Sequence, residues 1–182
     1  MKIIDLPQNA EVIKQAANLL HESFGTPAAW PTIDSAIEEV TESLADERLS
    51  RIAIDDEEHV IGWIGGIRQY DGNVWELHPL VVSESHREKG IGRALVSDFE
   101  SLVSERGGIT VILGTDDLES KTSLSGVDLY PDVYHHINSI KNLRKHPYEF
   151  YQKLGYVITG VVPDANGLGK PDILMSKRIR SR

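Results

Sequence analysis

A short glycine-containing run offers the clearest chemistry in this sequence. Arg87, Gly90 and Gly92 form an Arg-x-x-Gly-x-Gly pattern that leads directly into a helical repeat of apolar residues. A helix N-terminus has unpaired N–H groups and a partial positive charge. The two glycines let the backbone approach a phosphate, and Lys89 and Arg93 add positive charge. The run predicts a phosphate-binding turn, and the alternative is an ordinary strand-to-helix connection.

The strand expected just before this turn, 74–82, carries unusual polar residues. Alternation puts Glu76, His78 and Leu80 on one face, where buried polar groups need partners. Pro79 cannot donate to a strand ladder, which predicts a bulge. Such a bulge would splay this strand from the next one and leave main-chain groups for an extended, amide-bearing ligand. Together with the phosphate-binding turn, this predicts coenzyme A as a ligand.

Acidic residues dominate the charge balance. The chain has 28 Asp and Glu residues against 19 Lys and Arg residues, a formal net charge of −9. This argues against a nucleic-acid-binding protein and is compatible with a cationic substrate, although many cytosolic proteins are acidic. Asp116 and Asp117 follow an expected strand, where ligands of such units gather. Asp116 is therefore a candidate substrate-binding residue, and the alternative is a carboxylate that serves a turn.

Several classes of protein are disfavoured by composition. The chain has no cysteine, so it has neither disulfides nor zinc–cysteine sites, which fits a cytoplasmic protein. It shows no signal peptide pattern and no apolar run near the roughly 18 residues of a membrane span. His135 and His136 are adjacent without metal-ligand spacing, so we expect no metal.

The first half of the chain predicts two helices and an antiparallel meander. A second helix is expected from about Ser35, with Ser35 and Glu38 as a capping box. Before it, Thr26–Pro31 is expected to be a loop that exposes Trp30, available to pack against a sugar ring. The other expected elements are a strand at 2–5, a helix at 8–24 and strands at 51–55, 59–69 and 74–82.

The pattern then changes to strand, helix, strand. A helix over 90–106 followed by a strand over 109–115 makes a βαβ unit with 74–82, whose two strands should be parallel. Helices are also expected over 133–143 and from Pro147 to Gly155, and the last strands over 156–162 and 172–179. The predicted fold is α/β, a mixed, mostly antiparallel sheet with helices on both faces. No convincing linker interrupts residues 1–182, which predicts a single domain.

These motifs resemble the GCN5-related N-acetyltransferase (GNAT) superfamily, whose Arg/Gln-x-x-Gly-x-Gly/Ala motif matches Arg87, Gly90 and Gly92 without departure. Within it, the chain resembles the aminoglycoside 6'-N-acetyltransferases of Gram-positive bacteria. The stretches that carry this likeness are WELHPLVV, RGGIT, LGTDDL, NLRKHPYEFYQKLGY and PDANGLGKPDI, within roughly residues 50–178. The resemblance implies transfer of an acetyl group from acetyl-coenzyme A to the 6'-amine of an aminoglycoside, in a ternary complex.

The resemblance also implies roles for individual residues. Glu76 would act as a base through water or hold the amine, with His78 in support, and the N–H of Leu80 would bind the acetyl carbonyl. Tyr151 would lie near the sulfur and protonate the departing thiolate. The expected cofactor-binding residues are Leu80, Val81, Val82, Arg87, Glu88, Lys89, Gly90, Ile91, Gly92, Arg93 and Tyr151.

Alternatives stay open at this point. Glu76 can instead form a structural ion pair, His78 can be a core histidine, and Tyr151 can be one more buried aromatic residue. The acceptor can be a polyamine, a peptide or another metabolite amine, and a non-catalytic acyl-coenzyme A-binding module is a further alternative. The family often forms homodimers, which is the expected partner arrangement here, with no nucleic acid and no membrane.

Overall fold

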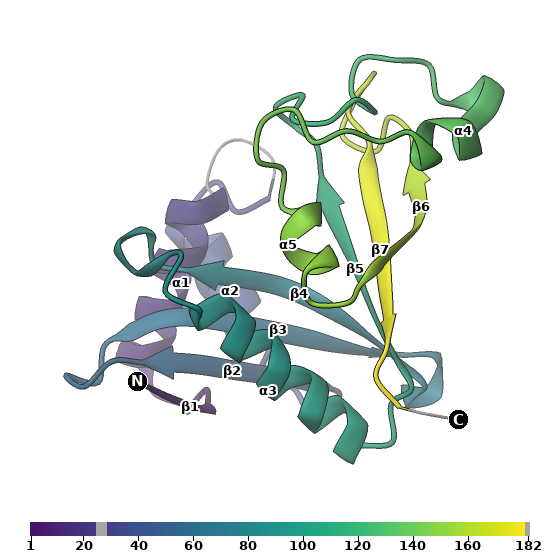
Figure 1. Ribbon diagram of the computed structural model, residues 1–182. Coiled ribbons are helices and arrows are strands. Elements are labelled where there is room, and N and C mark those ends of the chain that lie inside the picture. Colours follow the sequence, from purple (N-terminus) through teal and green to yellow (C-terminus); the bar gives the residue numbers. More distant parts are fainter. Residues whose placement is uncertain (25–28, 181–182) are drawn as a thin grey trace. The chain divides into compact units, whose positions relative to one another are not determined.

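The structure, a computed structural model, describes residues 1–24 and 29–180 (Figure 1). Its contacts divide the chain into two compact units, one of Met1–Ile109 and one that begins at Thr110. The predicted single domain over 1–182 therefore stays a prediction. The first part of the predicted Thr26–Pro31 loop lies outside the described residues. No helix in the described ranges is long and apolar enough to cross a membrane.

The first unit contains a four-stranded antiparallel sheet in the order β1-β2-β3-β4. The predicted meander is confirmed, and the turn between β3 and β4 is a short 3-10 segment at Tyr70–Gly72. The strands are β1 (Lys2–Asp5), β2 (Arg48–Ile54), β3 (Val60–Gln69) and β4 (Val74–Val82).

Helices cover both faces of this sheet (Figure 1). On one face α1 (Ala10–Phe24) and α2 (Ile33–Glu42) pack against a core that includes Trp63 of β3. On the other face lies α3 (Ile91–Glu105), whose Phe99 ring fills the space beside Gly66. A Cβ atom at Gly66 would lie 2.2 Å from that ring. Glycine at this position therefore lets α3 pack close to the sheet.

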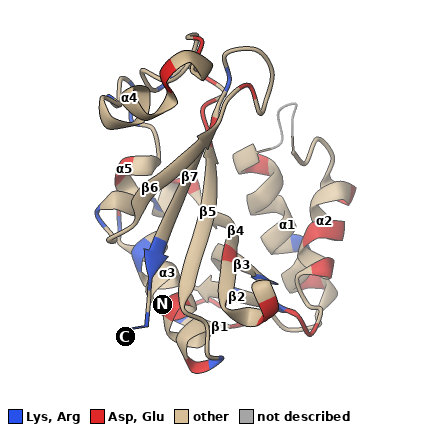
Figure 2. Ribbon diagram, turned by 90° about the vertical axis from the view of Figure 1, so that its right-hand side faces the viewer, with Lys and Arg blue, Asp and Glu red and all other residues tan. Residues whose placement is uncertain are grey.

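The start of α2 differs from the prediction. Thr32 is the N-cap, and its hydroxyl accepts a hydrogen bond from the Ser35 amide at 3.1 Å. The Ser35 hydroxyl accepts one from the Thr32 amide at 3.3 Å, which completes a capping box. The predicted box at Ser35 and Glu38 is wrong, because this reciprocal pair starts the helix one turn earlier. The outer face of α2 is acidic (Figure 2).

A bulge interrupts the pairing of β3 with β4, as the position of Pro79 predicts. Gly66 pairs with Leu77 and Ile64 pairs with Leu80, so two residues of β4 lie opposite one residue of β3. That one residue is Gly65, and a Cβ atom there would lie 2.4 Å from the carbonyl oxygen of His78. The close backbone approach at the bulge therefore requires glycine.

The second unit contains a three-stranded antiparallel sheet in the order β5-β7-β6. Together, the sheets and helices of the two units confirm the α/β class. The bounds of β4, α3 and β5 each lie within one residue of the prediction. The elements of the second unit are β5 (Thr110–Asp116), a 3-10 segment at Tyr130–Asp132, α4 (Val133–Asn138), α5 (Tyr148–Gln152), β6 (Val157–Val162) and β7 (Asp172–Arg178).

Helix α4 is shorter than the predicted helix over 133–143. The Ser139 hydroxyl donates to the carbonyl of His135 at 2.8 Å, at the residue where the helix ends. Beyond it, the Leu143 amide donates to the carbonyl of Lys121 at 2.7 Å, and Thr122 forms an antiparallel bridge with Asn142. The backbone of 141–143 is paired with a distant loop, so it is not available for a longer helix.

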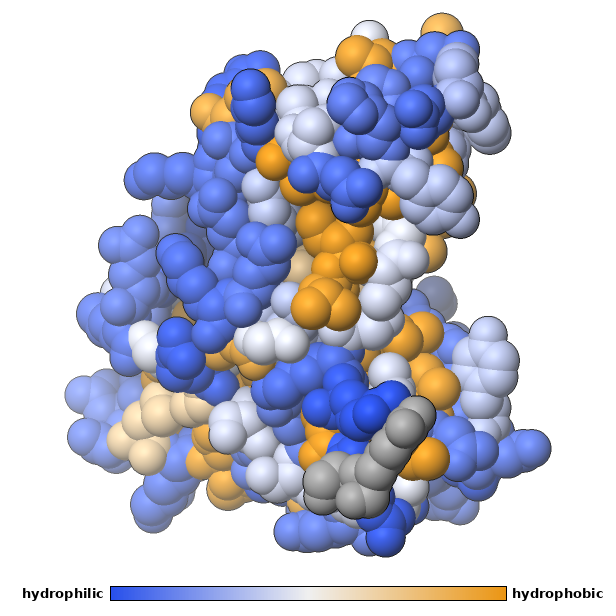
Figure 3. Space-filling model, turned by 45° about the vertical axis from the view of Figure 1, so that its right-hand side comes forward, coloured by the Kyte–Doolittle hydropathy of each residue, from blue (hydrophilic) through white to orange (hydrophobic). Residues whose placement is uncertain are grey.

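Strand β6 is the terminal strand of this sheet and carries exposed apolar side chains. Val157 and Val162 are both exposed, and Leu168, in the loop after β6, is 94% exposed. Figure 3, in which this side of the second unit comes forward, shows apolar side chains at its surface. An edge strand with an apolar outer face is a feature that proteins often cover.

We expect Gly65→Ala to destabilise the protein by roughly 1–3 kcal/mol, because the new methyl group would collide with backbone atoms that cannot rotate away. Gly160→Ala on β6 is the matched control, since its Cβ would lie 3.6 Å from the nearest atom, an ordinary contact. Urea unfolding of both variants measures the difference. Equal stability of the two variants would contradict the bulge geometry.

Candidate functional site

Strand β4 carries the residues that the sequence singles out. Glu76, His78 and Leu80 are half-buried, and the residues between them on the strand are buried. Glu76 pairs with Ile67, and Leu80 pairs with Ile64, three residues away on β3. The bulge therefore shifts the alternation: Leu80 lies on the face that α3 covers, and Glu76 lies on the opposite face. The predicted shared face of Glu76, His78 and Leu80 is wrong for Leu80. The Glu76 carboxylate accepts a short hydrogen bond from the side-chain amide of Gln69 on β3. This contact orients the carboxylate on the face of β4 that it shares with His78.

Gln69 is a functional neighbour that no local motif of the sequence marks. It pairs with Val74 across the hairpin, which makes it the diagonal neighbour of Glu76 on the same face. The signal was present in the turn at 70–73, which sets the register of the two strands. Counting pairs outward from that turn places Gln69 opposite Val74, two residues from Glu76.

Trp30 does not occupy the exposed position that the loop composition predicts. Its side chain is partly buried and packs against the core cluster of the first unit. Its ring centroid lies 5.7 Å from that of His78, with 47° between the ring planes. The structure therefore brings Trp30 to the face of β4 that carries Glu76 and His78, and its predicted role as an exposed sugar platform needs revision.

The turn after β4 shapes the N-terminus of α3. Its first part is a 3-10 segment at Glu84–His86, and the Arg87 guanidinium then donates from Nε to the carbonyl of Val82 at 3.3 Å. Glu88 and Gly90 have positive φ angles of 61° and 85°. These conformations turn the chain sharply into the helix.

Gly90 is the N-cap of α3 and leaves the helix end open. A Cβ atom at this position would meet no atom within 4 Å, among the described residues. The first intrahelical bond runs from the Ala94 amide to the Gly90 carbonyl at 3.0 Å. The amides of Ile91, Gly92 and Arg93 precede it, in the turn where helix N–H groups have no intrahelical acceptor.

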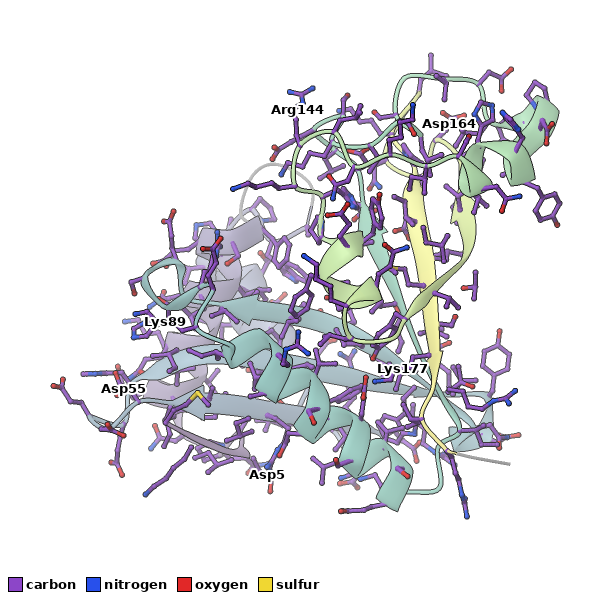
Figure 4. The ribbon with its side chains drawn as sticks, in the orientation of Figure 1. Asp5, Asp55, Lys89, Arg144, Asp164 and Lys177 are labelled. Atoms are coloured by element: carbon purple, nitrogen blue, oxygen red, sulfur yellow. The ribbon has the colours of Figure 1, made fainter. Side chains whose placement is uncertain are left out.

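The side chains around this helix end fit an anion. Arg93 and Lys89 are exposed, and Lys89 lies in the turn that leads into α3 (Figure 4). Ile91 is buried, which fixes the first turn of α3 against the sheet. Val81 and Val82 pair with Trp63 and Gly62 of β3, so the strand that leads to the turn is held in place. The turn therefore has the geometry and charge of a phosphate site.

Asp116 and Asp117, which belong to the second unit, have different environments. Asp117 is 1% exposed and accepts hydrogen bonds from the amides of Lys121 and Thr122 and from the Thr122 hydroxyl. It therefore holds the loop after β5. Asp116 is exposed at the end of β5, and its carboxylate accepts a hydrogen bond of 2.5 Å from the side-chain amide of Asn166. Of the two, Asp116 is the one able to meet a ligand.

A buried histidine holds the backbone of Asp116. His146 is 2% exposed, and its Nε2 lies 3.1 Å from the carbonyl oxygen of Asp116. Because a carbonyl only accepts, Nε2 carries the hydrogen, and Nδ1 accepts from the Tyr148 amide at 3.3 Å. Burial lowers the pKa of His146. The imidazole is therefore neutral, and both of its nitrogens form hydrogen bonds. No sequence pattern marked His146 or Asn166 as a neighbour of Asp116.

Tyr151 on α5 is buried among aromatic residues. Its ring centroid lies 5.0 Å from that of Phe150 and 5.7 Å from that of Tyr156, both in edge-on geometry. Desolvation by burial raises the pKa of Tyr151 far above its ordinary value. The phenol is therefore protonated at neutral pH and available as a hydrogen-bond donor.

Metal ligands do not gather in the part of the chain that the structure describes. No group of three or more His, Asp or Glu side chains is placed there to hold an ion. Asp164, in the loop between β6 and β7 (Figure 4), accepts a hydrogen bond of 2.6 Å from the Gly169 amide. It serves the local turn.

The buried neutral His146 predicts a pH dependence of stability. An unfolded histidine has a pKa of about 6.5, so the unfolded chain binds a proton before the folded one does. The free energy of unfolding should therefore fall as the pH drops below about 6.5 towards the lower pKa of the folded state. Urea titrations at about pH 7.5 and about pH 5.5 should show a smaller loss for His146→Gln than for the wild type. His59→Gln, at an exposed histidine, is the control, and a loss in His146→Gln equal to that of the wild type would contradict this assignment.

Comparisons with known proteins agree with this geometry. The acetyltransferase (GNAT) family model matches residues 13–123. A crystal structure of an aminoglycoside 6'-N-acetyltransferase complexed with coenzyme A is 46% identical, with a TM-score of 0.94 over 100% of this chain and 99% of that one. The aminoglycoside 6'-N-acetyltransferase from Enterococcus faecium is 48% identical, with a TM-score of 0.91 and the same coverage.

A third crystal structure, of an aminoglycoside 6'-acetyltransferase type Ii, is 42% identical, with a TM-score of 0.77 over 100% of this chain and 99% of that one. A search of curated proteins found no match. The family model covers more than half of the chain, and the three solved structures match it from end to end. The chain belongs to the GNAT acetyltransferase family.

Proposed function

We propose that the chain transfers the acetyl group of acetyl-coenzyme A to the 6'-amine of an aminoglycoside. The observation that carries this proposal is the end-to-end similarity, at 42–48% identity, to three enzymes named for that reaction. Membership of the GNAT family makes the chain an acetyl-coenzyme A-dependent N-acetyltransferase. The negative net charge of −9 agrees with a polycationic acceptor.

The open N-terminus of α3 supports the site proposed for the cofactor. Gly90 leaves the helix end accessible, and the amides of the first turn offer donors to a diphosphate. When bound there, acetyl-coenzyme A supplies the activated acetyl thioester. The residues we assign to its binding are Leu80, Val81, Val82, Arg87, Glu88, Lys89, Gly90, Ile91, Gly92, Arg93 and Tyr151.

The acceptor amine must lose a proton before it attacks. We assign Glu76 as the base that accepts this proton through a water molecule, because Gln69 orients its carboxylate on the face of β4. The amine nitrogen then bonds to the acetyl carbon, and the carbon–sulfur bond breaks. The Leu80 amide is assigned to the acetyl carbonyl oxygen, where negative charge develops. His78 supports the amine, and Asp116 is assigned to another ammonium group of the acceptor.

Tyr151 is assigned to the departing sulfur. Its raised pKa keeps the phenol protonated, so the O–H group can donate a hydrogen bond to the thiolate as it forms. Complete transfer to a thiolate, whose ordinary pKa is near 8.5, is uphill from such a phenol. Stabilisation by the hydrogen bond is therefore the main contribution. The second proton, which the nitrogen loses as the amide forms, balances the proton that the sulfur takes up to become the thiol.

We also propose a cytoplasmic homodimer. The absence of cysteine in the sequence agrees with a reducing compartment. The apolar outer face of the edge strand β6, with Val157 and Val162, agrees with an interface between two copies. Sedimentation equilibrium of the purified chain tests this, and a monomer at all concentrations would refute the dimer.

An acetylation assay tests the proposed acceptor. With acetyl-coenzyme A, we expect rapid transfer to kanamycin and slow transfer to spermidine, because the enzymes that resemble this chain are named for aminoglycosides. Release of the free thiol measures both rates. Comparable rates on both amines, or none on kanamycin, would refute the aminoglycoside assignment. Cofactor binding by calorimetry without transfer to any amine would indicate a non-catalytic module.

Gly92→Glu should lower the affinity for coenzyme A by about 100-fold or more, because a carboxylate in the first turn of α3 would repel the phosphates. Calorimetry with coenzyme A measures the loss. Ser97→Glu adds the same charge at an exposed position further along α3 and serves as the control. Equal affinity for coenzyme A in the two variants would refute the assignment of the phosphate site to the N-terminus of α3.

Tyr151→Phe should lower kcat by about 10- to 100-fold with little change in cofactor affinity, because the ring stays while the hydrogen-bond donor is lost. Steady-state kinetics and calorimetry measure the two quantities. Tyr134→Phe, at a tyrosine that is 77% exposed, is the control. A kcat unchanged from the wild type would exclude Tyr151 from the reaction.

A further inference from the structure

His78 has an aromatic neighbour that comes from a distant part of the chain. Trp30 lies in the segment before α2, and its ring centroid is 5.7 Å from the imidazole of His78 with 47° between the planes. His78 is half-buried on the face of β4 that also carries Glu76. The indole is therefore the aromatic neighbour of the imidazole on the face of β4 that carries Glu76.

Trp30 is itself held on three sides. The Nδ1 atom of His21 lies 3.0 Å from the Trp30 carbonyl oxygen, and because a carbonyl only accepts, His21 donates this hydrogen bond. The Phe24 ring contacts the indole edge-on, with 5.8 Å between centroids. The Trp30 side chain also packs against the core cluster that α1, α2 and the sheet share. These contacts fix the indole before any ligand arrives.

We propose that Trp30 is a positioning residue for His78, and that it limits the imidazole to the orientation that serves the acceptor amine. This inference deepens the proposed function and rests on it. Trp30 acts through His78 and is not assigned a contact with the reacting atoms. A side chain that is ordered before binding loses less conformational entropy in the transition state, so the effect should appear in kcat.

A double-mutant cycle tests the coupling between the two residues. Trp30→Leu should lower kcat by about 3- to 10-fold, the range expected for loss of one aromatic pair, with the KM for kanamycin nearly unchanged. In the His78→Ala background, Trp30→Leu should have no further effect. Trp30→Phe keeps an aromatic ring and should restore most of kcat. Tyr134→Leu, at an exposed tyrosine of α4, is the control.

Two kinetic outcomes would overturn the proposal. Independent, multiplicative effects of the two substitutions would show that Trp30 does not act through His78. A rise in KM for kanamycin with kcat unchanged would instead make Trp30 a direct contact of the sugar. Thermal unfolding of each variant checks that it is folded. If Trp30→Leu does not fold, Trp30→Phe, which preserves most of the packing, is compared with the wild type in its place.

A spectroscopic measurement separates this proposal from the proposed function. In the protein without ligands, the indole ring current should shift the NMR signals of the His78 ring protons, and Trp30→Leu should return them towards ordinary values. The signals of His59, which is exposed and lies in the turn between β2 and β3, should not move. His78 signals that stay in place in Trp30→Leu would overturn the proposal. Shifted His78 signals in a protein that acetylates no amine would refute only the proposed function.

Discussion

The contact between Gly65 and the carbonyl of His78 is the constraint on which the candidate site depends. No side chain fits between them, since a Cβ atom at Gly65 would lie 2.4 Å from that oxygen. The close approach allows His78 and Pro79 to share one place in the pairing with β3. Because two residues of β4 lie opposite one residue of β3, the alternation of faces shifts at the bulge: Leu80, paired with Ile64, lies on the face that α3 covers, and Glu76 lies on the opposite face.

The same strand positions the helix that follows. Gly62 and Gly66 of β3 leave space that Leu95 and Phe99 of α3 fill, and added Cβ atoms would lie 2.9 Å and 2.2 Å from those side chains. This packing holds the axis of α3 close to the sheet. Its N-terminus, with Gly90 as an open cap, is then fixed relative to the end of β4. The three glycines of β3 thus set the bulge and seat the helix.

In the second unit, buried polar groups take the place of such backbone contacts. Asp117 and His146 are almost completely buried, and each is satisfied by hydrogen bonds to the loops around it. Burying an unsatisfied polar group costs several kcal/mol by order of magnitude, so these bonds specify the loop conformation. They leave the Asp116 carboxylate exposed and oriented by Asn166. A local sequence pattern could not reveal this, because the partners are 30 and 50 residues away from Asp116.

The amino-acid sequence was sufficient for the strands of the first unit, the helix over 91–105 and the bulge at Pro79, because each depends on periodicity or on the chemistry of proline and glycine within a few residues. It placed Leu80 on the wrong face of β4, because simple alternation does not account for the extra residue of the bulge. It misplaced the start of α2 and the end of α4, where Thr32 and the pairing of 141–143 compete with helix propensity. The neighbours of the candidate residues came from the fold alone. Gln69 reaches Glu76, Trp30 reaches His78 and His146 reaches Asp116 through contacts between separate segments, and such contacts exist only once the chain has packed.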